Sequence, residues 1–216
     1  MKFYHYPHCP FCQRVRLALR FKGLEYEDIV LSYADVETPT KLIGAKMLPI
    51  IEFDDGTIMA ESLDLLAELE KRFPAPAMYF GNTADDLSWA SRAIMSIPRY
   101  FDLTLPYHLE AYAQAGEFDE AGTKYFKEGK EAKRGVTFES LQAARIEIYK
   151  DNVEAPLHAI AEKLNEGFVG ESFSVADCVL ASDMFGVTLV PDIELPDGVR
   201  DYIKAVEEVC GETLLV

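Results

Sequence analysis

The sequence predicts a mixed α/β domain followed by an all-helical domain. Strand-like and helix-like segments alternate as far as residue 73, whereas helical periodicity dominates after about residue 84 and almost no strand signal is left. Between the two patterns lies Pro74-Ala75-Pro76, which ends a helix because proline disfavours the helical conformation of the residue before it. We therefore expect domains over residues 1–73 and 84–216, joined by a linker over 74–83.

The first domain begins with a strand pattern over residues 2–6 and an amphipathic helix over 10–22. Pro10 suits the first turn of this helix, and Gly23 suits its C-terminal cap. Further along, Asp54-Asp55-Gly56 is a hairpin signal between two strands. The complete order is β-α-β-α-β-β-α, which is typical of a thioredoxin-like domain. The other expected segments are strands over 25–31, 49–53 and 57–60, a short helix or irregular stretch over 35–45, and a helix over 62–73.

The second domain is expected to contain only helices. Its clearest signal is Ser174-Val175-Ala176-Asp177, an S-x-x-D capping box that precedes an apolar run and predicts the start of a helix. Cys178 falls inside that helix, so we expect a buried, inert thiol. Segment 102–118 gives no clear prediction. The expected helices lie near 84–101, 119–132, 137–150, 152–166, 174–190 and 198–210.

The composition excludes several kinds of partner. The chain has 216 residues and a formal net charge of −16 at pH 7, so its surface repels nucleic acid and anionic lipid. No run approaches the roughly 18 apolar residues of a membrane span, and the first residues show no secretory signal. Two of the four cysteines form a CxxC motif rather than a disulfide framework. We therefore expect a cytoplasmic protein without nucleic-acid or membrane partners, and we take a monomer as the working expectation, although nothing in the sequence identifies the oligomeric state.

Cys9-Pro10-Phe11-Cys12 is the strongest chemical signal in the chain. It directly follows the first strand and opens the first helix, where unpaired N–H groups stabilise a thiolate on the first cysteine. Residues 1–24 contain five basic residues and no acidic residue, which favours that thiolate further. A CxxC motif beside a βαβ pattern is typical of thioredoxin-like redox chemistry. We therefore expect Cys9 and Cys12 to form a redox-active pair with Cys9 as the nucleophile.

The alternative interpretation of the motif is a zinc site with His8 as a third ligand. Structural zinc needs four ligands, but Cys178 and Cys210 form no second CxxC motif. The four histidines also form no HxxxH pair. We therefore expect no metal, and we interpret His8 as a turn residue beside the nucleophile.

Leu48-Pro49 is a candidate binding element if the domain has the thioredoxin-like order. In that fold the X–Pro bond at the start of this strand is typically cis and exposes the preceding backbone to pair with a bound peptide. Taken alone, an ordinary proline at a strand start would explain the same residues. The preceding loop holds Lys41 and Lys46, either of which could reach the glycine carboxylate of glutathione, although solvated loop lysines are the simpler interpretation.

Glu61-Ser62 is a second candidate element, at the start of the helix after the hairpin. Ser62 is expected to be the N-cap, and a helix N-terminus binds anions. The γ-glutamyl carboxylate of glutathione could therefore bind there, with Glu61 near its ammonium group. Simple capping by Ser62 is the competing interpretation. The combination with the CxxC motif and Leu48-Pro49 favours a glutathione site.

Four segments resemble a known family: MKFYHYPHCPFCQRVR, TPTKLIGAKMLPII, MAESLDLL and, at residues 124–141, KYFKEGKEAKRGVTFESL. They are similar to segments of the bacterial two-domain glutaredoxins (type two). The resemblance implies a glutathione-transferase fold, glutathione as co-substrate, and disulfide-containing or glutathionylated proteins as partners. It implies that Cys9 and Cys12 form the redox disulfide. The glutathione-binding residues that we expect are Pro10, Phe11, Lys46, Leu48, Pro49, Glu61 and Ser62.

Two other functions stay open. Phe11 stands where these glutaredoxins have tyrosine, and the same form occurs in omega-class transferases, so an omega-like transferase or dehydroascorbate reductase could use Cys9. Those relatives usually lack the second cysteine, and Cys12 therefore favours a glutaredoxin. The other alternative is a redox-gated binding protein, in which a Cys9–Cys12 disulfide changes a partner surface without turnover.

Overall fold

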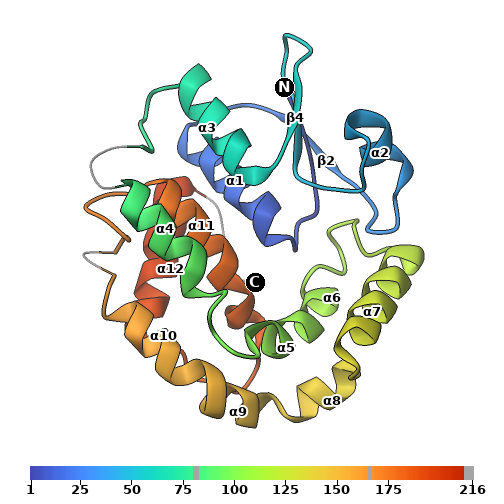
Figure 1. The fold of residues 1–216 in the computed structure, drawn as a ribbon, viewed down its shortest axis with the longest axis vertical. Helices are drawn as coiled ribbons and strands as arrows, with labels where there is room; N and C mark the ends of the chain where they lie inside the picture. Colours follow the sequence, from blue (N-terminus) through green and yellow to red (C-terminus); the bar gives the residue numbers. More distant parts are fainter. Residues whose placement is uncertain (80–82, 165–166, 212–216) are drawn as a thin grey trace.

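The computed structural model describes residues 1–79, 83–164 and 167–211 of the chain. Figure 1 shows a small sheet with its helices at one end of the molecule and a larger array of helices at the other. Between these two parts, helix α1 (Pro10–Phe21) packs against helix α11 (Val175–Met184). The expected α/β domain followed by an all-helical domain is therefore confirmed.

The first part is a four-stranded sheet in the order β2-β1-β3-β4. Strands β1 and β2 are parallel, whereas β1 pairs with β3, and β3 with β4, in antiparallel fashion. This arrangement confirms the predicted order β-α-β-α-β-β-α. In chain order after β1 (Lys2–His5) and α1, the elements are β2 (Glu27–Val30), α2 (Glu37–Ile43), β3 (Ile50–Glu52), β4 (Ile58–Ala60) and α3 (Ser62–Arg72).

Helix α1 begins where its sequence predicts and ends one residue earlier than expected, at Phe21, with Lys22 as its C-cap. Pro10 is its first residue, where the missing N–H costs no hydrogen bond. Val15 and Leu19 are fully buried on the face that meets the core. After the last turn Gly23 has φ +62°, and the Leu24 N–H donates to the Leu19 carbonyl at 3.0 Å. This left-handed position suits glycine and stops the helix before β2.

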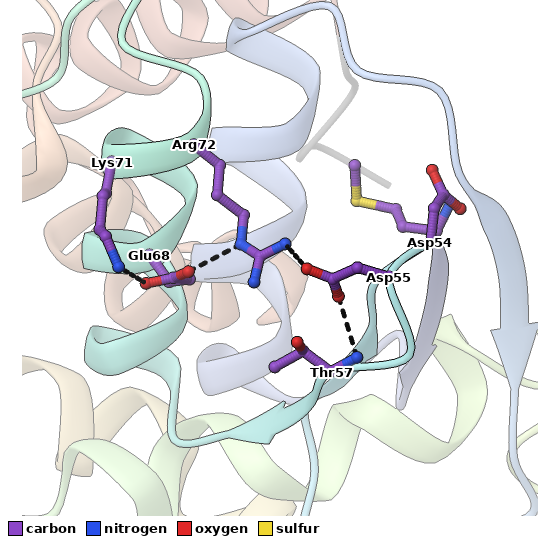
Figure 2. Close-up of polar contacts among 7 residues, drawn as sticks. Asp54, Asp55, Thr57, Glu68, Lys71 and Arg72 are labelled. Carbon is purple, nitrogen blue, oxygen red and sulfur yellow. Dashed lines mark hydrogen bonds and ion pairs between the residues drawn. The ribbon is translucent and has the colours of Figure 1, made fainter.

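The hairpin between β3 and β4 is joined to α3 by exposed ion pairs (Figure 2). Asp55 accepts the Thr57 backbone N–H at 2.9 Å and binds Arg72 Nη1 at 2.7 Å. The Arg72 Nε also binds Glu68 at 2.7 Å. The Thr57 N–H and then the Arg72 guanidinium lower the pKa of Asp55 to about 2. Because these side chains lie at the surface, we expect them to orient the hairpin more than they stabilise it.

The second part contains only helices among the described residues. Its first helix, α4, begins at Thr83, and Lys22 at the end of α1 binds the preceding chain at Phe73 and Pro76. The buried Lys22 ammonium binds Glu70 at 2.8 Å and the carbonyls of Phe73 and Pro76. The helices are α4 (Thr83–Ala93), α5 (Tyr100–Thr104), α6 (His108–Ala111), α7 (Glu120–Arg134), α8 (Phe138–Ala143), α9 (Arg145–Ile148), α10 (Glu154–Ala161), α11 and α12 (Asp197–Cys210), with short turns at Leu105–Tyr107, Tyr149–Val153 and Phe185–Leu189.

The sequence overestimated the length of several helices. The helix expected over 84–101 ends at Ala93, because Pro98 interrupts it and Arg99 adopts a left-handed φ of +56° before α5 begins. The helix expected over 137–150 is divided into α8 and α9, and the one expected over 174–190 ends as a 3-10 turn. Parts of the segments expected over 74–83, 152–166 and 84–216 lie outside the described residues.

Helix α11 is the centre of the second part, and all ten of its residues are buried. The predicted capping box is present: Ser174 Oγ accepts the Ala176 N–H at 3.2 Å, and Asp177 Oδ2 accepts the Ser174 N–H at 2.9 Å. Cys178 is fully buried, and burial raises the pKa of its thiol. The prediction of an inert thiol at this position agrees with that environment.

Candidate active site

The two thiols of the CxxC motif lie at the start of α1. Cys9 is the residue before the helix, and its carbonyl accepts the N–H groups of Cys12 and Gln13 at 3.0 and 2.9 Å. Cys12 is fully buried, and the Tyr6 N–H donates to its sulfur at 3.4 Å. Cys9 is partly exposed. A substrate can therefore approach Cys9, whereas Cys12 is reached only through Cys9.

The two sulfurs have opposite pKa shifts. A hydrogen bond from the Cys12 thiol lowers the pKa of Cys9, burial opposes this, and the N–H groups of Cys12 and Phe11 add to the lowering. Burial raises the pKa of Cys12, and the hydrogen bond to Cys9 raises it further. The lowered pKa of Cys9 agrees in direction with the thiolate that the sequence predicts there. The main cause at Cys9 is the second thiol, rather than the basic residues of the first helix.

A buried glutamate that no sequence pattern predicts lies directly beside this motif. Glu117, from the segment before α7, has no exposed surface, and it holds His8 with both carboxylate oxygens. Oε1 accepts the His8 backbone N–H at 3.0 Å, and Oε2 lies 2.6 Å from His8 Nδ1. The Glu117 carbonyl also accepts the Tyr33 N–H at 2.8 Å. The second part of the molecule thus fixes the residue that precedes the nucleophile.

Burial controls the charge of this pair. It raises the pKa of Glu117 to about 8 and lowers the pKa of His8 to about 3. At neutral pH the pair therefore holds one proton and carries no net charge. An ionised Glu117 would raise the pKa of Cys9. His8 is thus a hydrogen-bonded turn residue, as its sequence position suggested. No cluster of three or more candidate metal ligands occurs among the residues that the structure describes.

Arg14 has a different role from the one its sequence position indicates. The sequence places it among the basic residues near Cys9, but the structure pairs it with Asp183 of α11. Arg14 Nη2 lies 2.8 and 2.9 Å from the two carboxylate oxygens, and both side chains are buried. Its guanidinium also lies 4.5 Å from the centre of the Phe11 ring and 3.5 Å from Ser62 Oγ. One side chain therefore connects α1, α3 and α11.

Five of the predicted glutathione-binding residues line one small cavity. It has a volume of about 210 Å³, and Met47 completes the lining formed by Phe11, Leu48, Pro49, Glu61 and Ser62. The Leu48–Pro49 peptide bond is cis, as expected for this position of the fold. The structure thus gathers residues from α1, from the strand start and from the beginning of α3.

The expected N-cap role of Ser62 is wrong. Ser62 is the first residue of α3, so the cap position belongs to Glu61, and neither side chain makes a capping hydrogen bond. The Ser62 side chain is buried and faces Arg14. Glu61 is exposed and has φ +69° and ψ 110°, a conformation that an L-residue adopts only with strain. This strained residue lies at the edge of the small cavity.

Lys46 and Pro10 line a second, larger cavity of about 500 Å³, which shares Phe11 and Leu48 with the small one. The Lys46 ammonium donates to the Tyr33 carbonyl at 2.6 Å and lies 3.9 Å from the centre of the Tyr125 ring. Cys9 lines this larger cavity. The nucleophile therefore has a cavity beside it that residues from both parts of the molecule enclose.

The fold and the paired thiols define a thiol-active protein of the glutathione-transferase fold. Residues 3–77 match the family described as glutathione S-transferase, N-terminal domain, and residues 87–216 match the one described as glutaredoxin 2, C terminal domain. Glutaredoxin 2 of Escherichia coli K12 is 31% identical over 207 residues, which cover 94% of this chain and 92% of that protein. The chain therefore belongs to the glutaredoxin 2 family. Like the other members of that family, it is a glutathione-dependent oxidoreductase.

Solved structures agree with this assignment. Glutaredoxin 2 of Salmonella typhimurium, solved in complex with glutathione, has a TM-score of 0.87 and 27% identity over 99% of this chain and 96% of its own. A glutathione S-transferase of Ceriporiopsis subvermispora has a TM-score of 0.75 and 22% identity, with 96% and 95% of the two chains covered, which shows the fold alone. No helix within the described residues is long and apolar enough to span a membrane.

Proposed function

We propose that the chain reduces protein disulfides and glutathione mixed disulfides through Cys9 and Cys12. The Cys9 thiolate attacks one sulfur of the substrate disulfide, that S–S bond breaks, and the other sulfur leaves as a thiolate that takes a proton from solvent. For a protein disulfide, Cys12 then attacks Cys9 and releases the second substrate thiol. The observation that carries this proposal is the pair of sulfurs with opposite pKa shifts, of which only Cys9 is accessible.

Glutathione is the proposed co-substrate, and the small cavity is its proposed site. The backbone of Leu48 would pair with the peptide, while Ser62 and the first N–H groups of α3 would receive the γ-glutamyl carboxylate. Glu61 is exposed beside them, which leaves its carboxylate available to the glutathione ammonium. Phe11 and Pro49 line the same cavity. Pro10 and Lys46 would contact glutathione from the larger cavity, next to Cys9.

We also propose that the functional units are a domain over residues 1–73, a linker over 74–83 and a helical domain over 84–216. The support is that α3 ends at Arg72 and α4 begins at Thr83. The matched family regions, 3–77 and 87–216, leave a gap at a similar place.

A coupled assay with glutathione and a small mixed disulfide tests this function. Cys9→Ser should abolish turnover of every disulfide. Cys12→Ser should still reduce glutathione mixed disulfides but should lose the reduction of protein disulfides, because glutathione replaces the resolving thiol only in the first reaction. Activity of Cys9→Ser would exclude Cys9 as the nucleophile. A dispensable Cys12 in every reaction would favour the omega-like transferase, and a lack of wild-type turnover would favour the redox-gated binding protein.

A further inference from the structure

The larger cavity beside Cys9 is positively charged, although the whole chain carries a net charge of −16. The only carboxylate among its lining residues is Asp183, and Arg14 binds both oxygens of that group. Four cations line the cavity: Lys46, Lys130, Lys133 and Arg134. We call this cavity the α7 pocket, because three of its four cations come from α7.

Three of these cations have no carboxylate partner in the described part of the chain, and one of the three, Lys46, donates to the Tyr33 carbonyl. Arg134 binds Asp102 at 3.0 Å, but neither Lys130 nor Lys133 forms an ion pair there. The spacing of three residues places both lysines on one face of α7. Burial lowers the pKa of Lys130, whereas charge on Cys9 raises it. The Lys130 ammonium is therefore within electrostatic reach of the reacting sulfur, and it is available to an anion.

The rest of the α7 pocket is mostly apolar and contains adaptable side chains. Phe11 and Met95 both line it and are 49% and 58% exposed, which are high values for large apolar residues. Methionine adapts to surfaces of different shape. The buried Tyr6 hydroxyl, which also lines the pocket, has no hydrogen-bond partner among the described residues. The lining thus offers apolar contact, one hydroxyl without a hydrogen-bond partner, and ammonium groups without a carboxylate partner within the described residues.

We propose that the α7 pocket binds the protein side of a mixed disulfide and favours segments in which Asp or Glu lies close to the reacting cysteine. This inference rests on the proposed function, since it names the substrate class of the same nucleophile. The Cys9 thiolate attacks the glutathione sulfur, the substrate S–S bond breaks, and the protein cysteine leaves as a thiolate that solvent protonates. Glutathione is then bonded to Cys9, and a second glutathione reduces that disulfide in the proposed cycle.

The charge distribution of the protein explains why only substrate residues close to the reacting cysteine would be selected. Exposed charges are screened beyond about 8–10 Å at ordinary salt, so the acidic surface has little effect on a segment already held in the pocket. An acidic side chain there meets Lys130 and Lys133, whereas the same two ammonium groups repel a basic side chain. The pocket would therefore respond to the residues beside the cysteine rather than to the net charge of the whole partner.

Three glutathionylated peptides test the proposal. They differ only in the two residues after the cysteine, which are Glu, Gln or Lys, and kcat/KM is measured at saturating glutathione in low and high salt. We expect the acidic peptide to exceed the basic one by about tenfold at low salt, as for a charged hydrogen bond, and we expect high salt to reduce this ratio. The variant Lys130→Gln/Lys133→Gln should bring the ratio close to one.

The matched control is Lys124→Gln/Lys204→Gln, which removes two exposed lysines outside the pocket and should keep the wild-type ratio. Equal kcat/KM for the three peptides in the wild type overturns the assignment of the α7 pocket. An unchanged ratio in Lys130→Gln/Lys133→Gln overturns it as well. Turnover of none of the peptides overturns the proposed reaction itself, so the two failures are distinguishable.

Discussion

Glu117 and His8 share one proton in the folded chain, and this makes the stability of the protein depend on pH in a specific way. Their ordinary pKa values of 4.5 and 6.5 apply to the unfolded chain, whereas the folded values are about 8 and about 3. Between pH 4.5 and 6.5 the folded chain holds its proton on Glu117 and the unfolded chain holds one on His8. The two effects therefore cancel in that range.

Above pH 6.5 only the folded chain keeps this proton, so we expect stability to fall as the pH rises from 6.5 to 8. One proton over this range corresponds to at most about 2 kcal/mol in the free energy of unfolding. Urea unfolding at a series of pH values between 6 and 8.5 measures the change. Glu117→Gln removes the titrating group and should flatten the curve, while the exposed Glu128→Gln should leave it as in the wild type. A wild-type curve as flat as that of Glu117→Gln contradicts the buried pair.

The thiol of Cys12 lowers the pKa of Cys9, which predicts a difference between two small substitutions. Cys12→Ala removes the hydrogen-bond donor, so the midpoint of Cys9 alkylation should shift to higher pH. Cys12→Ser keeps an O–H donor at the same place and should shift it less. Alkylation rates with iodoacetamide followed against pH give both midpoints. Midpoints unchanged from the wild type in both variants would show that the Cys12 thiol does not contribute to the lowered pKa of Cys9.

At the scale of elements, the contact between α1 and α11 depends on a buried ion pair. Asp183→Asn leaves the Arg14 guanidinium buried without a counter-charge, and such a loss typically costs about 3–5 kcal/mol. The double variant Arg14→Met/Asp183→Leu replaces the pair by apolar groups, so it should recover most of that loss. Urea unfolding of the two variants measures both effects. A double variant no more stable than Asp183→Asn would mean that the pair orders the interface in a way that apolar packing cannot replace.

At the beginning of α3, Glu61 is expected to lower the stability of the fold and to contribute to glutathione binding. Glu61 is strained at φ +69°, so Glu61→Gly should raise the free energy of unfolding by about 1 kcal/mol. It also removes the carboxylate proposed to face the glutathione ammonium, and the glutathione KM should therefore rise. Glu61→Gln keeps the strain and should raise only the KM. Thermal unfolding and glutathione titration separate the two effects, and an unchanged KM in both variants would mean that Glu61 has no part in binding.

At the scale of the whole molecule, the sequence predicted the order of elements and the position of the thiols. These depend on local signals, such as the period of apolar residues, the proline and glycine at the ends of α1, and the capping box before α11. Five of the six residues that line the small cavity were also named from the sequence, since three local motifs meet there, and only Met47 was not. Features that depend on local sequence signals could therefore be predicted without the structure.

The residues that contact the site from distant parts of the chain could not be predicted from such signals. Glu117 lies in a segment without periodicity, and its partner His8 is 109 residues away in the chain. Asp183 likewise belongs to a buried helix whose sequence gives no sign of Arg14. The Ser62 prediction was wrong by one residue because the strained Glu61 takes the cap position. Each of these features depends on tertiary contacts that a single sequence does not encode in any local pattern.

The ion pair between Arg14 and Asp183 joins residues that are 169 positions apart. On a ribosome that adds about 5–20 residues per second, Arg14 is made roughly 10–30 s before its partner. During this interval the nascent chain already contains both cysteines of the CxxC motif but has neither Asp183 nor the complete α11 surface against which α1 packs. The dithiol therefore acquires its final surroundings only after α11 has been made.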